Sequence, residues 1–138
     1  TQKGETFNQA YKKVRKEELV FNPYRVNVGS IGIIDDEFDG YYISPAYIVF
    51  GVKETILNDY VYLVLSSNWY NRFLRATTSG SVRQNLTFDL LGELEIPLPD
   101  IEVQTQIVER WLQLKQQQIN LKNEIQQFKN HFSNQILL

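Results

Sequence analysis

Few side chains in this sequence have the type and spacing that catalysis requires. His131 is the single histidine, and the chain contains no cysteine, so thiol catalysis and cysteine-ligated zinc sites are excluded. The acidic run Asp35–Asp39 lacks the spaced ligands of an EF-hand loop and is expected to form a solvated hairpin turn. Pro99-Asp100 is followed by no Glu-x-Lys or Asp-x-Lys of the nuclease type, and helix capping explains it better. The sequence therefore predicts no catalytic centre and no metal site.

Two further short motifs are expected to be turns. Asn22-Pro23-Tyr24 matches only part of the Asn/Asp-Pro-Pro-aromatic motif with which amino-methyltransferases hold a flipped base, since one proline is missing. No glycine-rich loop for a methyl donor precedes it. Gly29-Ser30-Ile31-Gly32 lacks the lysine and the length of a phosphate-binding loop. Neither motif therefore indicates an enzyme.

Polar and basic side chains gather in two parts of the chain. Overall, 14 Lys and Arg stand against 16 Asp and Glu, unlike the strongly basic total of a nonspecific nucleic-acid binder. Residues 1–25 nevertheless carry six basic and three acidic side chains, and residues 66–88 carry three arginines and no acid. This segregation hints at a basic face. In the second of these segments, residues 79–86 combine Arg83 with Gln84 and Asn85. This combination suits hydrogen bonds to phosphates and base edges, but it equally suits a polar connection between helices.

The elements that position these side chains are expected to form two regions. Residues 1–99 predict a compact, mixed α/β (α+β) domain with a mixed sheet, and the aromatic content of 13% is enough to build its core. Because Thr1 is not a start methionine, this domain is expected to be N-terminally incomplete. No apolar run approaches the length of a membrane span. Strands are predicted at 19–21, 24–28, 31–34, 41–43, 47–52 and 94–96, and helices at 8–16, after Asn58 or Asp59, after Asn68 and after Thr87.

Residues 100–138 predict one long coiled-coil helix that begins at Asp100. No glycine or proline interrupts residues 101–138, and at ~1.5 Å per residue the helix would extend roughly 55 Å. This length exceeds what the domain can cover, so the helix is expected to pack on another helix. Lysines follow one edge of the pattern, and Leu112 and Ile119 widen its apolar stripe. The eight core positions of the heptads, which we call the seam, are Ile107, Trp111, Leu114, Gln118, Leu121, Ile125, Phe128 and Phe132, and all but Gln118 are apolar.

Three stretches of the sequence carry a resemblance to a known family. They are Ile43–Phe50, Ser79–Phe88 with Leu90-Leu91, and the join Ile96–Pro99 followed by Glu102, Gln104, Gln106, Ile107 and Val108. Together they resemble the target recognition domain, with its spacer helix, of the DNA specificity subunits of type I restriction-modification enzymes. Similar domains are fused C-terminally to DNA adenine methyltransferases, so both kinds of parent chain remain open.

The resemblance implies a cytoplasmic, non-catalytic component that needs no cofactor. Such a domain recognises one half of a bipartite site in double-stranded DNA, while methyltransferase and restriction subunits carry out the chemistry. Two long helices of that family pair antiparallel, which implies a homodimer or a second half-subunit here. The rival hypothesis is an interaction module that dimerises through the helix and binds no nucleic acid. The candidate DNA-contacting residues are Lys12, Lys13, Arg15, Arg25, Arg72, Arg75, Arg83, Gln84 and Asn85.

Overall fold

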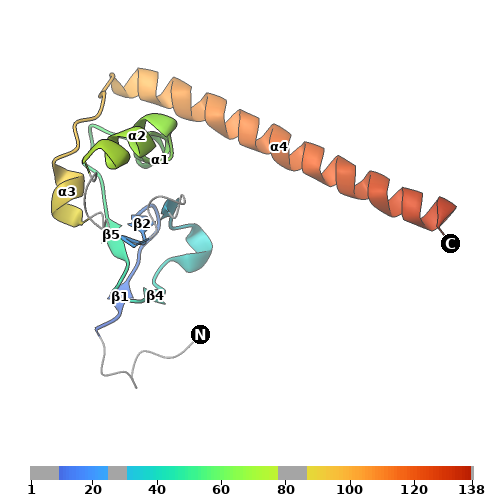
Figure 1. Cartoon of the computed structure of the whole chain (residues 1–138), viewed down its shortest axis with the longest axis horizontal. Coiled ribbons are helices and arrows are strands. Elements are labelled where there is room, and N and C mark those ends of the chain that lie inside the picture. The colour runs from blue at the N-terminus through green and yellow to red at the C-terminus, as the bar shows by residue number, and fades with distance from the viewer. Residues whose placement is uncertain (1–9, 25–30, 78–86, 138) are drawn as a thin grey trace.

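The computed structural model describes residues 10–24, 31–77 and 87–137, and for residues 73–77 the backbone alone. The described elements form a small mixed α+β body from which one long helix projects (Figure 1), so the predicted fold class is confirmed. Their order is β1 (Lys12–Lys13), β2 (Leu19–Phe21), β3 (Ile31–Ile33), η3 (Asp36–Phe38), β4 (Tyr42–Ile43), β5 (Ile48–Phe50), α1 (Asn58–Leu65), α2 (Asn68–Thr77), α3 (Phe88–Gly92) and α4 (Ile101–Ile136).

The core lies between a three-stranded antiparallel sheet and helix α1. The sheet has the order β3-β2-β5, and Val20 of the central strand is paired with Gly32 on one side and Val49 on the other. Because successive strand residues point to opposite faces, Leu19 and Phe21 share one face. Both are buried in one cluster with Val61 and Leu65 of α1 and with Tyr70 of α2. Four predicted strands, 19–21, 31–34, 41–43 and 47–52, are thus confirmed to within two residues at either end.

The predicted helix at 8–16 is wrong in its described part. Residues Lys12–Lys13 instead form β1, an antiparallel partner of β4 with Lys13 opposite Tyr42. The Val14 backbone extends this pairing through hydrogen bonds with Tyr41 and Gly40, both at 2.8 Å, and the Val14 side chain is buried. Pairing with a distant segment has overridden the local preference for a helix.

The acidic segment is a turn, although not the hairpin that the sequence predicted. It contains the short helix η3 and joins β3 of the three-stranded sheet to β4 of the two-stranded sheet, so it links two sheets rather than two paired strands. The turn predicted at Asn22-Pro23-Tyr24 is confirmed, and the Asn22 side chain accepts a hydrogen bond from the Tyr24 backbone at 3.0 Å.

Three other predicted elements differ. Tyr24 lies in that turn, so the strand predicted at 24–28 does not begin there, and residues 25–28 lie outside the described part. Gly32 lies within β3 rather than in a turn, because it pairs with Val20, while residues 29–30 lie outside the described part. Residues 94–96 form no strand, because their alternating apolar side chains line a cavity instead of extending the sheet.

The helix starts follow the predicted pattern with one exception. Thr87 caps α3 by accepting a hydrogen bond from the Leu90 backbone at 3.1 Å, and Asp100 occupies the N-cap position of α4, as predicted. The predicted cap of α1 at Asn58 or Asp59 is wrong, because the N-cap is Leu57 and no side chain caps it. The backbone N–H of Leu57 is instead bound by a side chain of α4.

Candidate nucleic-acid interface and helix-pairing face

A single buried amide fastens the start of α4 to the body. Gln104 is 0% exposed, although it lies on the first turns of a helix that is otherwise mostly exposed. Its side-chain oxygen accepts a hydrogen bond from the Leu57 backbone at 2.9 Å. Its side-chain nitrogen donates to the carbonyls of Thr55 and Pro99, at 3.1 and 2.8 Å. The amide thereby provides hydrogen-bond partners for backbone groups at the start of α1, in the preceding loop and in the join to α4.

Aromatic and apolar contacts extend this attachment over the next turns. Tyr60 donates its hydroxyl to the Pro97 carbonyl at 2.7 Å. Val108 is buried, and the Trp111 ring lies 5.4 Å from the ring of Tyr62, centroid to centroid. The first three turns of α4 are therefore held by the body, and these contacts set the direction in which the rest of the helix leaves it.

Beyond Trp111, the helix carries its apolar seam with no cover. Figure 1 shows this part of α4 projecting away from the body toward the C-terminus. Leu121 is 58% exposed and Phe128 is 69% exposed, and the other seam residues after Trp111 are exposed as well. At the body end, Ile107 lines a notch between α1, α2 and the join, with a volume of about 320 Å³. The structure therefore places all eight predicted pairing residues on α4, where seven are exposed and Trp111 is half-buried.

A basic and aromatic patch lies at the other end of the body. Lys13 and Tyr42 are cross-strand partners and so share one side of the β1–β4 ribbon. The Lys12 ammonium group donates to the Tyr47 carbonyl at 2.6 Å, which brings a third segment to the ribbon. Lysine ammonium groups and tyrosine hydroxyl groups can both hydrogen-bond to the phosphate oxygens of duplex DNA. We call this set the basic–aromatic patch; its members are Tyr11, Lys12, Lys13, Tyr41, Tyr42 and Tyr47.

The other cations near this ribbon differ in how far acids neutralise them. Lys16 forms an ion pair with Asp36 at 2.6 Å, and the hydrogen bond and charge of Asp36 raise the pKa of Lys16. Arg15 is exposed, and its backbone N–H is bound by the Glu18 carboxylate at 2.8 Å. The predicted contacts Lys12, Lys13 and Arg15 therefore lie together, and no ion pair involves them within the described residues.

The remaining predicted DNA contacts are not assembled with these three. Arg72 is exposed on α2, and Figure 1 shows α2 and β1 at opposite ends of the body. Arg25, Arg83, Gln84 and Asn85 lie outside the described residues, as does the side chain of Arg75. The tyrosines of the patch were missed by the sequence reasoning, although Tyr41, Tyr42 and Tyr47 follow each other closely in a segment of strands.

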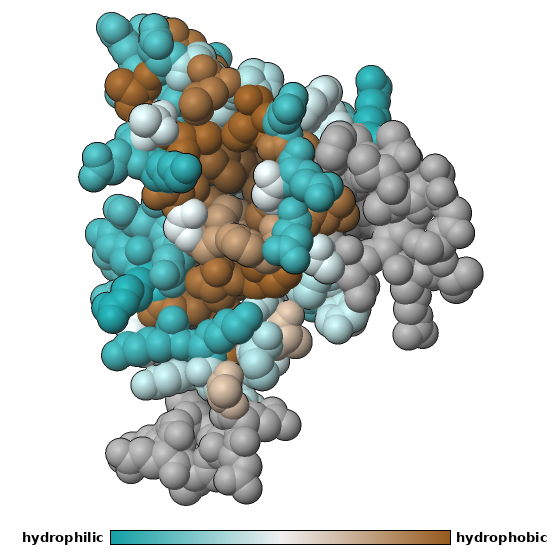
Figure 2. Space-filling view, turned by 90° about the vertical axis from the view of Figure 1, so that its left-hand side faces the viewer, coloured by the Kyte–Doolittle hydropathy of each residue, from teal (hydrophilic) through white to brown (hydrophobic). Residues whose placement is uncertain are grey.

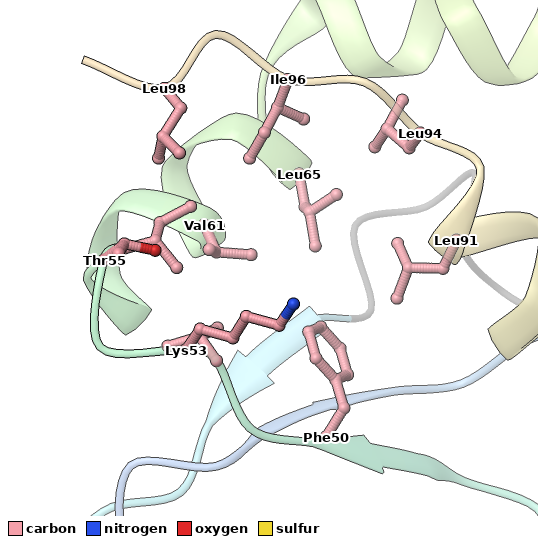
Figure 3. Close-up of a pocket in the computed structure, with 11 residues that line it drawn as sticks. Phe50, Lys53, Thr55, Val61, Leu65, Leu91, Leu94, Ile96 and Leu98 are labelled. Atoms are coloured by element: carbon pink, nitrogen blue, oxygen red, sulfur yellow. The ribbon is translucent and has the colours of Figure 1, made fainter.

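An apolar cavity of about 490 Å³ opens on the side that carries α3. Figure 2 shows this side as a hollowed brown area framed by hydrophilic side chains, and Figure 3 shows Leu91, Leu94, Ile96 and Leu98 around the cavity. The Lys53 amine points into the cavity from the opposite wall. Among the described residues that line the cavity, none carries a carboxylate or an imidazole.

Metal and membrane features were searched over the described part of the chain. Residues 10–24, 31–77 and 87–137 hold no group of three or more acidic or histidine side chains placed to bind a metal ion. Over the same ranges, no helix combines the length and the hydropathy needed to cross a membrane.

The chain is similar to proteins of one functional group. A family model described as the type I restriction modification DNA specificity domain matches residues 2–128. The HindI specificity subunit, a type I restriction enzyme component of Haemophilus influenzae, is 29% identical over 105 residues, which cover 73% of this chain and 23% of that protein. The crystal structure of the HsdS subunit from Thermoanaerobacter tengcongensis superposes with a TM-score of 0.73 at 19% identity, over 94% of this chain and 34% of that one. The chain thus spans about a quarter to a third of the length of these relatives.

Proposed function

Because the chain belongs to the family of type I restriction modification DNA specificity domains, we propose that it recognises one half of a bipartite site in double-stranded DNA. In this proposal the chain acts in the cytoplasm, is itself non-catalytic and needs no cofactor. Methyltransferase and restriction subunits carry out the chemistry on the bound DNA. The family match over residues 2–128 is the observation that carries the proposal, and it favours DNA recognition over the interaction-only alternative.

We further propose that the two parts of the structure divide the work. Residues of the body contact DNA. They are Lys12, Lys13 and Arg15 beside the patch tyrosines, and Arg25, Arg72, Arg75, Arg83, Gln84 and Asn85. The seam of α4 pairs antiparallel with a like helix, either from a second copy or from a second half-subunit. The rigid attachment through Gln104 supports this division, because it fixes the body relative to the helix that would set the distance between two half-sites.

DNA binding is tested by the salt dependence of affinity. Duplexes are first selected from a random pool with the parent chain, and their affinity is then measured by fluorescence anisotropy between about 50 and 200 mM salt. Each phosphate contact contributes about one to the slope of log affinity against log salt, so Lys13→Ala should lower the slope by about one. The matched control is Lys53→Ala, which removes the same charge beside the apolar cavity and should leave the slope unchanged.

A base contact gives a different result from a phosphate contact. Arg83→Ala should cost about 1–3 kcal/mol and relax the selected sequence at one position if Arg83 contacts a base edge. Uniform weakening across all duplexes would assign Arg83 to a phosphate instead. Loss of thermal stability with unchanged DNA affinity would assign it a structural role. A parent chain that selects no sequence and shows no salt dependence would refute the proposal.

Helix pairing is tested by sedimentation at about 0.5 M salt, where charge repulsion between helices is screened. Leu121→Asp with Ile125→Asp would place charges in the seam, at a cost of several kcal/mol, and should give monomers. The control pair, Gln116→Asp with Asn123→Asp, adds the same charges on the opposite side of α4 and should leave the assembly intact. Equal masses for the seam variant and its parent would refute pairing between two copies of the chain.

A further inference from the structure

Three lysines follow the seam along one edge of α4. Lys115, Lys122 and Lys129 recur every seven residues, and each comes directly after a seam residue. Within the described residues none of them forms an ion pair, because the one ion pair there joins Lys16 to Asp36. The Lys115 ammonium group lies 4.5 Å from the centroid of the Trp111 ring. We call these three residues the lysine edge. Glu124 is the sole acidic residue between Trp111 and Leu138.

The spacing of the seam fixes one antiparallel register in which every layer is filled. In this register Ile107 faces position 132 of the partner, Trp111 faces 128, Leu114 faces 125 and Gln118 faces 121. A second copy of the chain would satisfy all eight positions in this way. The apolar layers alone therefore do not distinguish a second copy from a related helix.

The flanking charges do distinguish them. When two helices pair antiparallel about a two-fold axis, the same edge of each helix comes to the same side of the interface. A second copy would thus place Lys122 beside Lys122 of its partner, and Lys115 beside Lys129. Charges at these flanking positions govern the choice of partner in coiled coils. The lysine edge therefore disfavours a second copy that the seam would accept.

We propose that the seam binds an antiparallel helix whose edge facing Lys115, Lys122 and Lys129 carries Asp or Glu, in preference to a second copy of the chain. This inference rests on the helix pairing of the proposed function and adds the chemistry of the partner. The notch beside Ile107, lined also by Tyr60, Leu63 and Trp69, continues the seam onto the body. In the register above, position 132 of the partner helix faces Ile107 and therefore lies at this apolar notch.

The probe partner is the chain itself with its edge reversed. In the variant Lys115→Glu, Lys122→Glu and Lys129→Glu, the seam is unchanged and three acids face the lysines of a parent chain. The loss of one repulsion and the gain of one attraction each change affinity by about twofold, so each position contributes about fourfold. Three positions therefore make the mixed dimer on the order of 60-fold tighter than the parent dimer at low salt. The three residues are exposed, so circular dichroism should show an intact helix.

The measurement is native mass spectrometry of parent and variant, mixed in equal amounts and titrated with salt. We expect the mixed dimer to dominate at low salt and its excess to shrink as salt rises. The control variant, Gln116→Glu, Asn123→Glu and Asn130→Glu, adds acids on the opposite side of the helix and should mix with the parent without preference.

Two results would overturn the inference. Statistical mixing of parent and edge-reversed chains would show that the lysine edge does not choose the partner. A parallel pair would give the same result, because Lys129 would then face Glu124 of the partner and reversal would remove an attraction. In either case the pairing and DNA proposals would stand. Absence of any dimer, even at high salt, would instead refute the pairing on which the inference depends.

Discussion

Replacing Gln104 with leucine should loosen the attachment of α4 to the body. The leucine side chain is one heavy atom shorter and cannot replace the three hydrogen bonds that the amide makes with Leu57, Thr55 and Pro99. Each hydrogen bond contributes about 0.5–1.5 kcal/mol net, and a buried group left without its partner costs more. We therefore expect the free energy of unfolding to fall by about 3 kcal/mol. For a chain of this size the midpoint temperature should fall by roughly 10 °C.

The assay is urea denaturation followed by tryptophan fluorescence. The chain contains two tryptophans, so the measurement uses a Trp69→Phe background, in which the emission of Trp111, which lies against Tyr62 at the attachment, reports directly on docking of the helix. Far-ultraviolet circular dichroism is less informative here, because α4 dominates the helical signal. Parent and variant are compared at one chain concentration, since helix pairing makes apparent stability depend on concentration.

The matched control is Gln106→Leu, two residues along the same helix. Gln106 is exposed, so the identical change there should alter the free energy of unfolding by no more than about 0.5 kcal/mol. A Gln104→Leu variant as stable as the Gln106→Leu variant would refute the reasoning. Gln104→Glu adds a further check. Its buried carboxyl should have a raised pKa, so stability present at low pH should be lost as the pH rises through that pKa.

Two further predictions concern tyrosine hydroxyl groups. Tyr60→Phe removes the hydrogen bond to the Pro97 carbonyl and should cost about 1 kcal/mol in urea denaturation, whereas Tyr42→Phe on the exposed ribbon should cost nothing measurable. Tyr70 is buried and its hydroxyl has no hydrogen-bond partner among the residues that the structure describes, so Tyr70→Phe should raise the free energy of unfolding by about 1 kcal/mol, and a loss of stability would contradict this. Burial also raises the pKa of Tyr70, so the parent should lose stability as the pH rises above about 10, and the Tyr70→Phe variant should lose less of it.

The regular elements were predictable where the local pattern and the packing agree. Residues 19–21 and 47–52 are rich in β-branched and aromatic residues, and Thr87 and Asp100 are ordinary helix-capping residues. The misses at residues 12–13 and 94–96 have physical causes. Lys12 and Lys13 form a strand because a segment about 30 residues away pairs with them, which no local signal shows. Residues 94–98 alternate because Leu94, Ile96 and Leu98 all reach into one cavity, and alternation predicts an extended chain rather than a paired one.

The candidate sites were predictable to a different extent. The seam follows from heptad spacing alone, and the helix that carries it is confirmed from Ile101 to Ile136. The role of Gln104 was not predictable, although it lies one heptad before Trp111, because a polar residue there is read as exposed unless its distant partners are known. The patch tyrosines gather through the pairing of β1 with β4, and that pairing was missed.

The attachment of α4 has a mechanical consequence, because the helix is held at one end and acts as a lever. Its 36 residues span about 54 Å at ~1.5 Å per residue. A tilt of about 10° at the Gln104 anchor would therefore displace the far tip by roughly 9 Å. With successive base pairs about 3.4 Å apart, that displacement equals between two and three base pairs of DNA. In the proposed pairing, the precision with which two such bodies are spaced therefore depends on the contacts at this pivot, where the Gln104 amide acts together with Tyr60, Val108 and Trp111, more than on the stiffness of the helix beyond it.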